Sequence, residues 1–409
     1  SLENKSSFVN IFKRLFPNNN PLDNSNNIIP NALVPEDFLK LPFKGGDTWR
    51  FTGGPHKGTY PNYTSLDFAP GVAQCTVPSD RWIVSPADGI VTYVGCGGCR
   101  IEIAHGPNWK SYFYHVANPK VVVGQTVSKN QKIGNPSQRP HCTGNCGGCG
   151  GDATGVHVHY TILYNGAAQP MDGQLLENWR VRAVQTEYAG YLERNGVIKS
   201  ATSDDPIKSD YLKPVSSVSI TGTQGQNGWY VSDVLVTITA MDTVSGVRQI
   251  QYNIDNNGWT EYFSPFVITT NGMHSLSYRS KDWSGNLEDA QSTTFMIDTA
   301  APTNPIFINP GCAIYSDVWQ NYCNDLFFSW SGATDNASGV SNYEYYWGKD
   351  PFGSTGTVTT ESFFDPTPVP IGVYYFRIHT KDYAGNWSDW ITLFILKYQS
   401  LLYLPIIYK

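Results

Sequence analysis

Apolar and polar residues alternate over much of the first half of the chain. Between residues 41 and 197, short runs carry an apolar residue at every second position, and glycine and proline separate the runs. A period of two is typical of a strand with one buried face. The clearest runs are 89–94, 100–104, 111–115 and 156–163. They predict an all-β domain built from an antiparallel β-sheet.

The second half contains an internal repeat. The sequence DTVSGV at 242–247 returns as DNASGV at 335–340, and KDWSGN at 281–286 returns as KDYAGN at 381–386. The copies lie roughly 100 residues apart, which is the size of one immunoglobulin-like sandwich. We therefore expect two tandem immunoglobulin-like (Ig-like) β-sandwiches, of the kind that follows many bacterial secreted proteins.

These patterns divide the chain into six segments. We expect an Asn-rich N-terminal extension, an antiparallel β domain, a linker, two Ig-like sandwiches and a C-terminal tail, at residues 1–40, 41–197, 198–214, 215–299, 300–398 and 399–409. The fold class is all-β throughout.

Charge and hydropathy exclude several classes of partner. Charged residues make up 15% of the 409 residues, and the formal net charge is −6. Because lysine and arginine form no runs, we expect no nucleic-acid partner. No stretch of about 20 apolar residues occurs, so we expect no membrane span. The chain opens at Ser1 without an apolar leader, which we interpret as a processed chain.

Eight cysteines, an even number, indicate disulfides and an oxidising compartment, so we expect a secreted protein. The alternative is a metal knuckle, because Cys96 and Cys99, like Cys146 and Cys149, have the C-x-x-C spacing of metal sites. The isolated pair 312 and 323 has no further ligand nearby and favours disulfides. The sequence alone does not choose the pairing.

Four histidines and one aspartate carry the candidate chemistry. His157 and His159 are two apart in an apolar alternation, so both imidazoles point to one face of a strand. Asp67 lies between two apolar residues on another predicted strand, where burial without a partner is costly. His56 follows two glycines and a proline, and His115 ends an aromatic run. Each histidine alone is more often structural, but the set favours a metal site.

Two histidines and one carboxylate, with a fourth position open to water, form the pattern of a hydrolytic zinc site. Zinc would lower the pKa of that water towards about 7 and polarise a substrate carbonyl. Neighbouring imidazoles that do not bind the metal could then act as general base and stabilise the oxyanion.

The order of the motifs resembles the lysostaphin-type zinc endopeptidases, and within them the beta-lytic branch. The resemblance covers roughly residues 43–170. It rests on GGPH at 53–56, SLDFA at 65–69, SPADG at 85–89, YFYH at 112–115, GQTVSKNQKIG at 124–134 and TGVHVH at 154–159.

The resemblance implies roles for the five residues. His56, Asp67 and His159 would be the zinc ligands, and His115 and His157 the catalytic histidines that do not bind the metal. The family cuts peptide bonds in the stems or cross-bridges of peptidoglycan, often at glycine. The implied substrate is therefore a peptidoglycan peptide or a glycine-rich protein, met outside a bacterial cell.

The sequence departs from the family pattern in two loops. Ten residues separate His56 from Asp67, where the commonest family spacing is three, so the loop with Tyr60, Pro61 and Tyr63 should shape a different groove. The Cys- and Gly-rich loop 142–151 should form a rim of the cleft. Of the other histidines, we expect a structural role for His105, His274 and His379 and assign none to His141.

Three other interpretations stay open. A zinc D,D-carboxypeptidase needs a late Glu-x-x-Trp-His motif, and the nearest match, 177–180, lacks the histidine. A retired peptidase fold could serve as a wall-binding adhesin or a hydrolase activator, but retired copies usually lose ligands. The Asn-rich segment 1–34 could cover the site.

The Ig-like segments also leave alternatives. Their Asp/Asn/Gly loops could bind calcium, but hairpin turns explain the same residues and no loop has dense carboxylates. Exposed aromatics could bind cell wall or glycans, although most, including Trp229, Trp259, Trp330 and Trp347, are expected in the sandwich cores.

Overall fold

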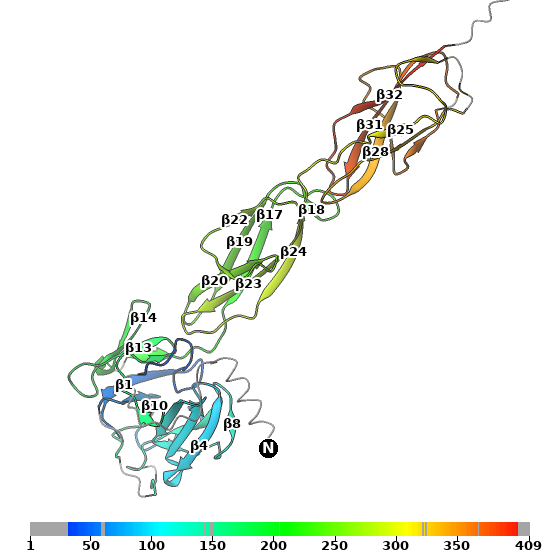
Figure 1. Ribbon diagram of the computed structural model, residues 1–409. Coiled ribbons are helices and arrows are strands. Elements are labelled where there is room, and N and C mark those ends of the chain that lie inside the picture. Colours follow the sequence, from blue (N-terminus) through cyan, green and yellow to red (C-terminus); the bar gives the residue numbers. More distant parts are fainter. Residues whose placement is uncertain are drawn as a thin grey trace, which may run out of the picture. The chain divides into compact units, whose positions relative to one another are not determined.

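A computed structural model shows the chain as a series of β structures (Figure 1). It describes residues 32–58, 62–142, 144–147, 151–203, 205–320, 323, 325–366 and 368–399. The segment 1–31, Tyr60, Pro61, Cys149 and the tail beyond residue 399 lie outside the described residues, and so do the expectations made for them. No helix among the described residues is long and apolar enough to cross a membrane.

The chain forms two compact units. The first comprises Ser1–Val215, Ala240–Gln249 and Ser280–Glu288, and the second Ser216–Thr239, Ile250–Arg279 and Asp289–Lys409. Both consist of strands with only short 3-10 turns in the part of the chain that the structure describes, so the all-β fold class is confirmed. The six domain boundaries stay a prediction.

The central sheet of the first unit contains nine of the described strands, in the order β16-β1-β2-β10-β6-β5-β4-β8, with β11 beside β10. The strands are β1 (Thr48–His56), β2 (Ser65–Ala69), β4 (Gly89–Gly95), β5 (Arg100–His105), β6 (Trp109–Tyr114), β8 (Thr126–Val127), β10 (Val158–Tyr164), β11 (Ala167–Ala168) and β16 (Pro206–Lys208). All pairings in this sheet are antiparallel, as predicted. Segment 198–214, expected as a linker, contributes β16, which pairs with β1.

Two smaller sheets complete this unit. One is β3-β9-β7 and the other β12-β13-β14-β15. Their bounds are β3 (Ile83–Val84), β7 (Val116–Ala117), β9 (Lys132–Pro136), β12 (Leu175–Leu176), β13 (Trp179–Arg182), β14 (Tyr191–Arg194) and β15 (Val197–Ser200), with 3-10 turns η1 (Cys96–Gly98) and η2 (Ala201–Ser203).

Strand alternation places the core on one side of the central sheet and the candidate site on the other. On β2, Leu66 and Phe68 are fully buried in the main hydrophobic cluster, while Asp67 between them points to the opposite face. On β10, Val158 and Tyr160 join the same cluster. Each such side chain contributes about 1.5–3 kcal/mol by burial. A shift of one residue in either strand would exchange core and site, so the core fixes the register.

The Ig-like repeats form two sandwiches of one three-stranded and one five-stranded sheet each, and most of their residues belong to the second unit. The first pairs β17-β19-β22 with β18-β24-β23-β20-β21, and the second pairs β25-β27-β30 with β26-β32-β31-β28-β29. Their bounds are β17 (Val215–Thr221), β18 (Trp229–Tyr230), β19 (Val234–Met241), β20 (Val247–Ile254), β21 (Thr260–Glu261), β22 (Phe266–Ile268), β23 (Gly272–Asp282), β24 (Gln291–Ile297), β25 (Phe307–Asn309), β26 (Trp319–Gln320), β27 (Phe328–Ser331), β28 (Val340–Gly348), β29 (Thr357–Thr359), β30 (Phe363–Phe364), β31 (Gly372–Asp382) and β32 (Ile391–Tyr398). The predicted tandem sandwiches are therefore present.

The tryptophans divide between core and surface. Trp330 is buried in the second sandwich, and Trp347 packs against the same cluster. Trp229 is half-buried at the edge strand β18. Trp259 is 38% exposed, with the guanidinium of Arg279 3.9 Å from its ring centroid, so its expected place in the core is wrong. The cation–π contact lets this ring stay at the surface.

Where both cysteines lie among the described residues, disulfides join Cys75 to Cys142, Cys99 to Cys146, and Cys312 to Cys323. No cysteine among the described residues is free. The favoured disulfide interpretation is confirmed. The alternative of a cysteine metal knuckle is wrong, because it needs free thiols at Cys96, Cys99 and Cys146, and all three sulfurs are in disulfides.

Candidate metal centre

Three adjacent strands bring the predicted ligands together. In the antiparallel register, His159 of β10 lies opposite Asp67 of β2, and Asp67 lies opposite Gly53 of β1. A β-bulge between Gly53 and His56 then turns the end of β1 towards the same point. A Cβ atom on Gly53 would lie 2.6 Å from Asp67 Oδ2, so only glycine leaves room for this carboxylate.

The facing atoms of these side chains form a small triangle. His56 Nε2 lies 3.3 Å from His159 Nδ1 and 3.5 Å from Asp67 Oδ2, and His159 Nδ1 lies 3.2 Å from Asp67 Oδ1. Tetrahedral zinc with bonds of 2.0–2.2 Å holds its ligands about 3.3–3.6 Å apart. All three residues are buried, with His56 only 1% exposed. The triangle therefore fits a zinc ion.

The hydrogen bonds of the two histidines support the same arrangement. His56 Nδ1 donates to the carbonyl of Gly54 at 2.8 Å, which leaves a lone pair on Nε2, the atom in the triangle. His159 instead turns Nδ1 to the triangle, and its buried Nε2 has no hydrogen-bond partner among the described residues. A proton on that Nε2 would leave the Nδ1 lone pair for a metal.

His115 and His157 lie beside the triangle, with their ring centroids 4.6 Å apart. His115 Nδ1 bonds to the carbonyl of Arg139 at 2.5 Å and His157 Nδ1 to that of Gly155 at 2.9 Å. His157 lies one residue before β10, in an isolated bridge with Ser137. In both rings the carbonyl bond favours a proton on Nδ1 and leaves the Nε2 lone pair free for proton transfer.

The environment of the site favours an ionised Asp67 beside neutral imidazoles of His56 and His115. Burial raises the pKa of Asp67, but His157, His159 and His56 outweigh it and hold the pKa of the carboxyl well below its usual range. Burial, together with the neighbouring histidines, lowers the pKa of His56 and that of His115, and the pKa of His115 falls to about 3. At neutral pH these two rings are neutral, as ligands and bases must be.

Sequence reasoning missed Tyr188, which lies in the loop after β13. Its ring stacks on that of His56 at 4.0 Å, and its side chain is 52% exposed. Its carbonyl accepts a hydrogen bond from Gly54 N at 2.9 Å. A Cβ atom on Gly54 would lie 1.9 Å from the carbonyl oxygen of Ala189, so this loop packs directly on β1. In the sequence, the adjacent glycines Gly53 and Gly54 were the one signal that another segment packs closely on β1.

Two loops face each other at this side of the triangle. Lys57 and Glu187 form an ion pair of 3.1 Å, and the hydroxyl of Tyr63 donates to the carbonyl of Gln185 at 3.1 Å. Tyr63 was expected to shape the groove, and it lies here beside the loop of Tyr188.

The remaining histidines bond outside the triangle. His105 is buried, with Nδ1 bonded to the carbonyl of Asp88 and Nε2 to Ser111, consistent with a structural role. His141 forms an exposed ion pair with Asp152 at 3.2 Å. In the sandwiches, the pairs are His274 with Asp255 at 2.8 Å and His379 with Glu344 at 3.1 Å.

Each sandwich repeat also contributes to a group of three aspartates whose oxygens lie within 4.8 Å of one another. The groups are Asp210, Asp242 and Asp282, and Asp298, Asp335 and Asp382. Their carboxylates accept backbone N–H groups; Asp242 Oδ1, for example, accepts three from its own loop. The turn geometry that the sequence favoured is present, and it also brings three carboxylates together in a group that could hold a cation.

Comparisons with known proteins find relatives of the first unit. Residues 71–172 match the model of peptidase family M23. A beta-lytic metalloendopeptidase from Lysobacter enzymogenes is 30% identical over 172 residues, which are 40% of this chain and 92% of that protein. Protease LasA from Pseudomonas aeruginosa is 27% identical over 161 residues, 38% of this chain and 36% of that protein.

A further relative is matched over less than half of its length, and a solved structure over almost all of its length. The chain spans 45% of a beta-lytic metalloendopeptidase from Achromobacter lyticus, with 30% identity. The solved structure of the M23 metalloprotease pseudoalterin is 28% identical, with coverage of 40% of this chain and 95% of that one and a TM-score of 0.35. The resemblance predicted from the order of motifs is confirmed: the chain belongs to peptidase family M23.

Proposed function

We propose that the protein is a secreted zinc metalloendopeptidase that hydrolyses peptide bonds in the stems or cross-bridges of bacterial peptidoglycan. The observation that carries the proposal is the buried triangle of His56, Asp67 and His159, with two further imidazoles beside it. The proposed substrate class follows from the resemblance to the lysostaphin-type endopeptidases, and it is supported by relatives called beta-lytic metalloendopeptidase and protease LasA. A glycine-rich protein is the second substrate with matching chemistry.

In this proposal His56 Nε2, Asp67 and His159 Nδ1 hold zinc. Bound zinc would supply a Lewis acid that polarises the scissile carbonyl and makes water nucleophilic near neutral pH. The buried carboxylate would offset part of the positive charge of the metal, and the strand register, which sets Asp67 opposite His159, supports this choice of ligands.

His115 and His157 would move the protons. Each has Nδ1 bonded to a backbone carbonyl, so each can accept a proton at Nε2 and return it to the leaving amine. His157 Nε2 lies 3.6 Å from Asp67 Oδ1, which would stabilise the imidazolium of that ring once it is protonated. The ring of His115 could donate to the developing oxyanion once its Nε2 has also taken a proton, because its Nδ1 proton is bound by the carbonyl of Arg139.

A retired peptidase fold is the weaker alternative. All five positions carry the residues that hydrolysis needs, and the geometry pre-forms the triangle. Disulfides in the peptidase unit and in the second sandwich support export to an oxidising compartment outside the bacterial cell.

For the sandwiches we propose attachment to the cell wall or its glycans. In support, the outer face of the sheet β25-β27-β30 carries Phe307 and Phe363, 64% and 51% exposed. Co-sedimentation of the full chain with purified walls should be weakened by the double change Phe307→Ser and Phe363→Ser. Unchanged co-sedimentation would leave the sandwiches as spacers.

The function is tested by mass spectrometry of fragments released from purified peptidoglycan. Wild-type protein should create new amino termini at stem or cross-bridge bonds, and the His159→Ala variant should create none. Glycine-rich polypeptides serve as the parallel substrate. No release from walls of several cross-bridge types, with zinc bound, would contradict the peptidoglycan proposal.

A further inference from the structure

His115 has a backbone conformation that depends on its neighbours. Its φ of +60° lies in the left-handed region, which residues with a side chain rarely adopt. Three hydrogen bonds surround it. Ser137 Oγ donates to the carbonyl of His115 at 2.7 Å, Val116 N donates to the carbonyl of Cys99 at 3.0 Å, and the imidazole Nδ1 bonds to the carbonyl of Arg139 at 2.5 Å.

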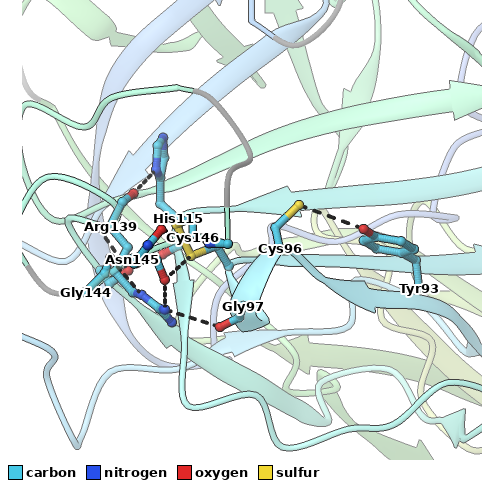
Figure 2. Close-up of a disulfide and its surroundings, with 11 residues drawn as sticks. Tyr93, Cys96, Gly97, His115, Arg139, Gly144, Asn145 and Cys146 are labelled. Atoms are coloured by element: carbon cyan, nitrogen blue, oxygen red, sulfur yellow. Dashed lines mark hydrogen bonds between the residues drawn. A yellow bond between two sulfur atoms is a disulfide. The ribbon is translucent and has the colours of Figure 1, made fainter.

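The side chain of Arg139 is bound to backbone carbonyls of two loops (Figure 2). Its Nε donates to Gly144 O at 3.3 Å, and its Nη2 donates to Gly97 O at 3.2 Å and to Asn145 O. Among the described residues it has no carboxylate within ion-pair distance. A guanidinium presents several donors in a fixed fork, which suits several carbonyls at once.

The same two loops are also joined covalently. Cys99, at the end of η1, forms a disulfide with Cys146, and both are fully buried. Gly97 lies in η1, and Asn145 directly precedes Cys146. The guanidinium of Arg139 therefore links the same two segments that the disulfide links. The carbonyl of Cys99 accepts a hydrogen bond from Val116 N, directly after His115, and the carbonyl of Arg139 bonds to the imidazole of His115.

We propose that Arg139 is a positioning residue of the peptidase, which acts through His115. Its guanidinium fixes the loop, and the fixed loop aims the carbonyl oxygen of Arg139 at His115 Nδ1. That bond sets the tautomer and the orientation in which Nε2 faces the site. The role in hydrolysis rests on the function proposed above, whereas the hydrogen-bond geometry does not.

The first test compares Arg139→Ala and Arg139→Lys in the zinc-loaded full chain, with Arg81→Ala as the control. Arg81 is in the same unit and pairs at the surface with Asp80. Arg139→Ala should lower kcat about 10- to 100-fold, with KM and bound zinc unchanged. Arg139→Lys should recover part of the loss, because an ammonium can still bond to the carbonyls. Unchanged kcat in Arg139→Ala, or a loss confined to KM, would overturn the proposal.

The second test does not need a substrate. Nitrogen-15 NMR of labelled histidines in the zinc-loaded wild type should show His115 with its proton on Nδ1, and Arg139→Lys should weaken this preference. A proton on Nε2 in the wild type would overturn the proposal, even if Arg139→Ala fails to fold. If the wild type does not cleave peptidoglycan, only the proposed function is contradicted, because the NMR measurement of the tautomer needs no substrate.

Discussion

The four histidines of the site divide into two kinds by the direction of their ring nitrogens. His56 and His159 each turn one nitrogen into a triangle with Asp67, and the edges of this triangle match a tetrahedral ion. His115 and His157 keep Nδ1 on backbone carbonyls and lie next to the triangle. This difference in geometry supports the division into ligands and proton carriers that the resemblance implied.

The first prediction separates these two kinds of residue. His115→Ala should lower hydrolysis about 10²- to 10⁴-fold, the usual contribution of a general acid or base. It should leave zinc content unchanged, since the ring is not in the triangle. Turnover and zinc content are measured on the same preparation. Full activity in this variant would refute the catalytic role of His115.

A second prediction concerns the buried His105. Burial lowers its pKa from 6.5 to about 4 in the folded chain. Between these two values the unfolded chain binds a proton that the folded chain does not, so stability falls as the pH falls. From pH 7 to pH 5 the loss is about 2 kcal/mol from this residue.

Urea unfolding at both pH values measures this difference. The His105→Gln variant should be less stable at pH 7 but lose about 2 kcal/mol less on acidification than the wild type. Equal losses in the two proteins would show that His105 titrates normally in the folded state.

At the scale of the element, strand register explains why the triangle exists. The alternation in β2 and β10 predicted that Asp67 and His159 leave the core, and the antiparallel pairing places them opposite each other. The sequence could not predict Tyr188 or Arg139, because both reach the site from loops through non-local contacts. Neither loop has a period or a motif that marks such contacts.

The close approach of β1 to β2 gives a third prediction. Gly53→Ala would place a methyl group 2.6 Å from Asp67 Oδ2 and displace the carboxylate, so zinc affinity should fall while the sheet is retained. The control is Gly166→Ala, in the turn between β10 and β11. There φ is +82° and no atom lies within 4 Å, so only stability should fall.

Zinc titration with a competing chelator, together with circular dichroism, distinguishes the two variants. Weaker zinc binding should occur in Gly53→Ala alone. Equal affinities would mean that Asp67 can move aside without loss of its contact to the metal.

At the scale of the whole molecule, the chain combines one unit that carries the site with a second that carries the sandwiches. The repeat of loop motifs predicted the sandwiches, and the motif order predicted the peptidase family. The sequence pattern placed Trp259 in the core, which is wrong. The pattern around a tryptophan does not distinguish a ring buried in a core from a surface ring covered by an arginine side chain.

The two units should respond differently to metal. A ligand that binds only the folded state stabilises by mass action, and this gain is limited to the unit that binds it. Calorimetry with and without a chelator should show a lowered transition for the first unit and an unchanged one for the second. A shift of every transition would contradict a single metal centre in the first unit.

The most direct test of the central claim joins metal binding to hydrolysis at Asp67. Zinc content and fragment release from peptidoglycan are measured together for the wild type and for Asp67→Asn, which keeps the shape of the side chain but removes its charge. We predict one zinc ion per chain and cleavage for the wild type, and loss of both for the variant. Cleavage by an Asp67→Asn protein that contains no zinc would contradict the account.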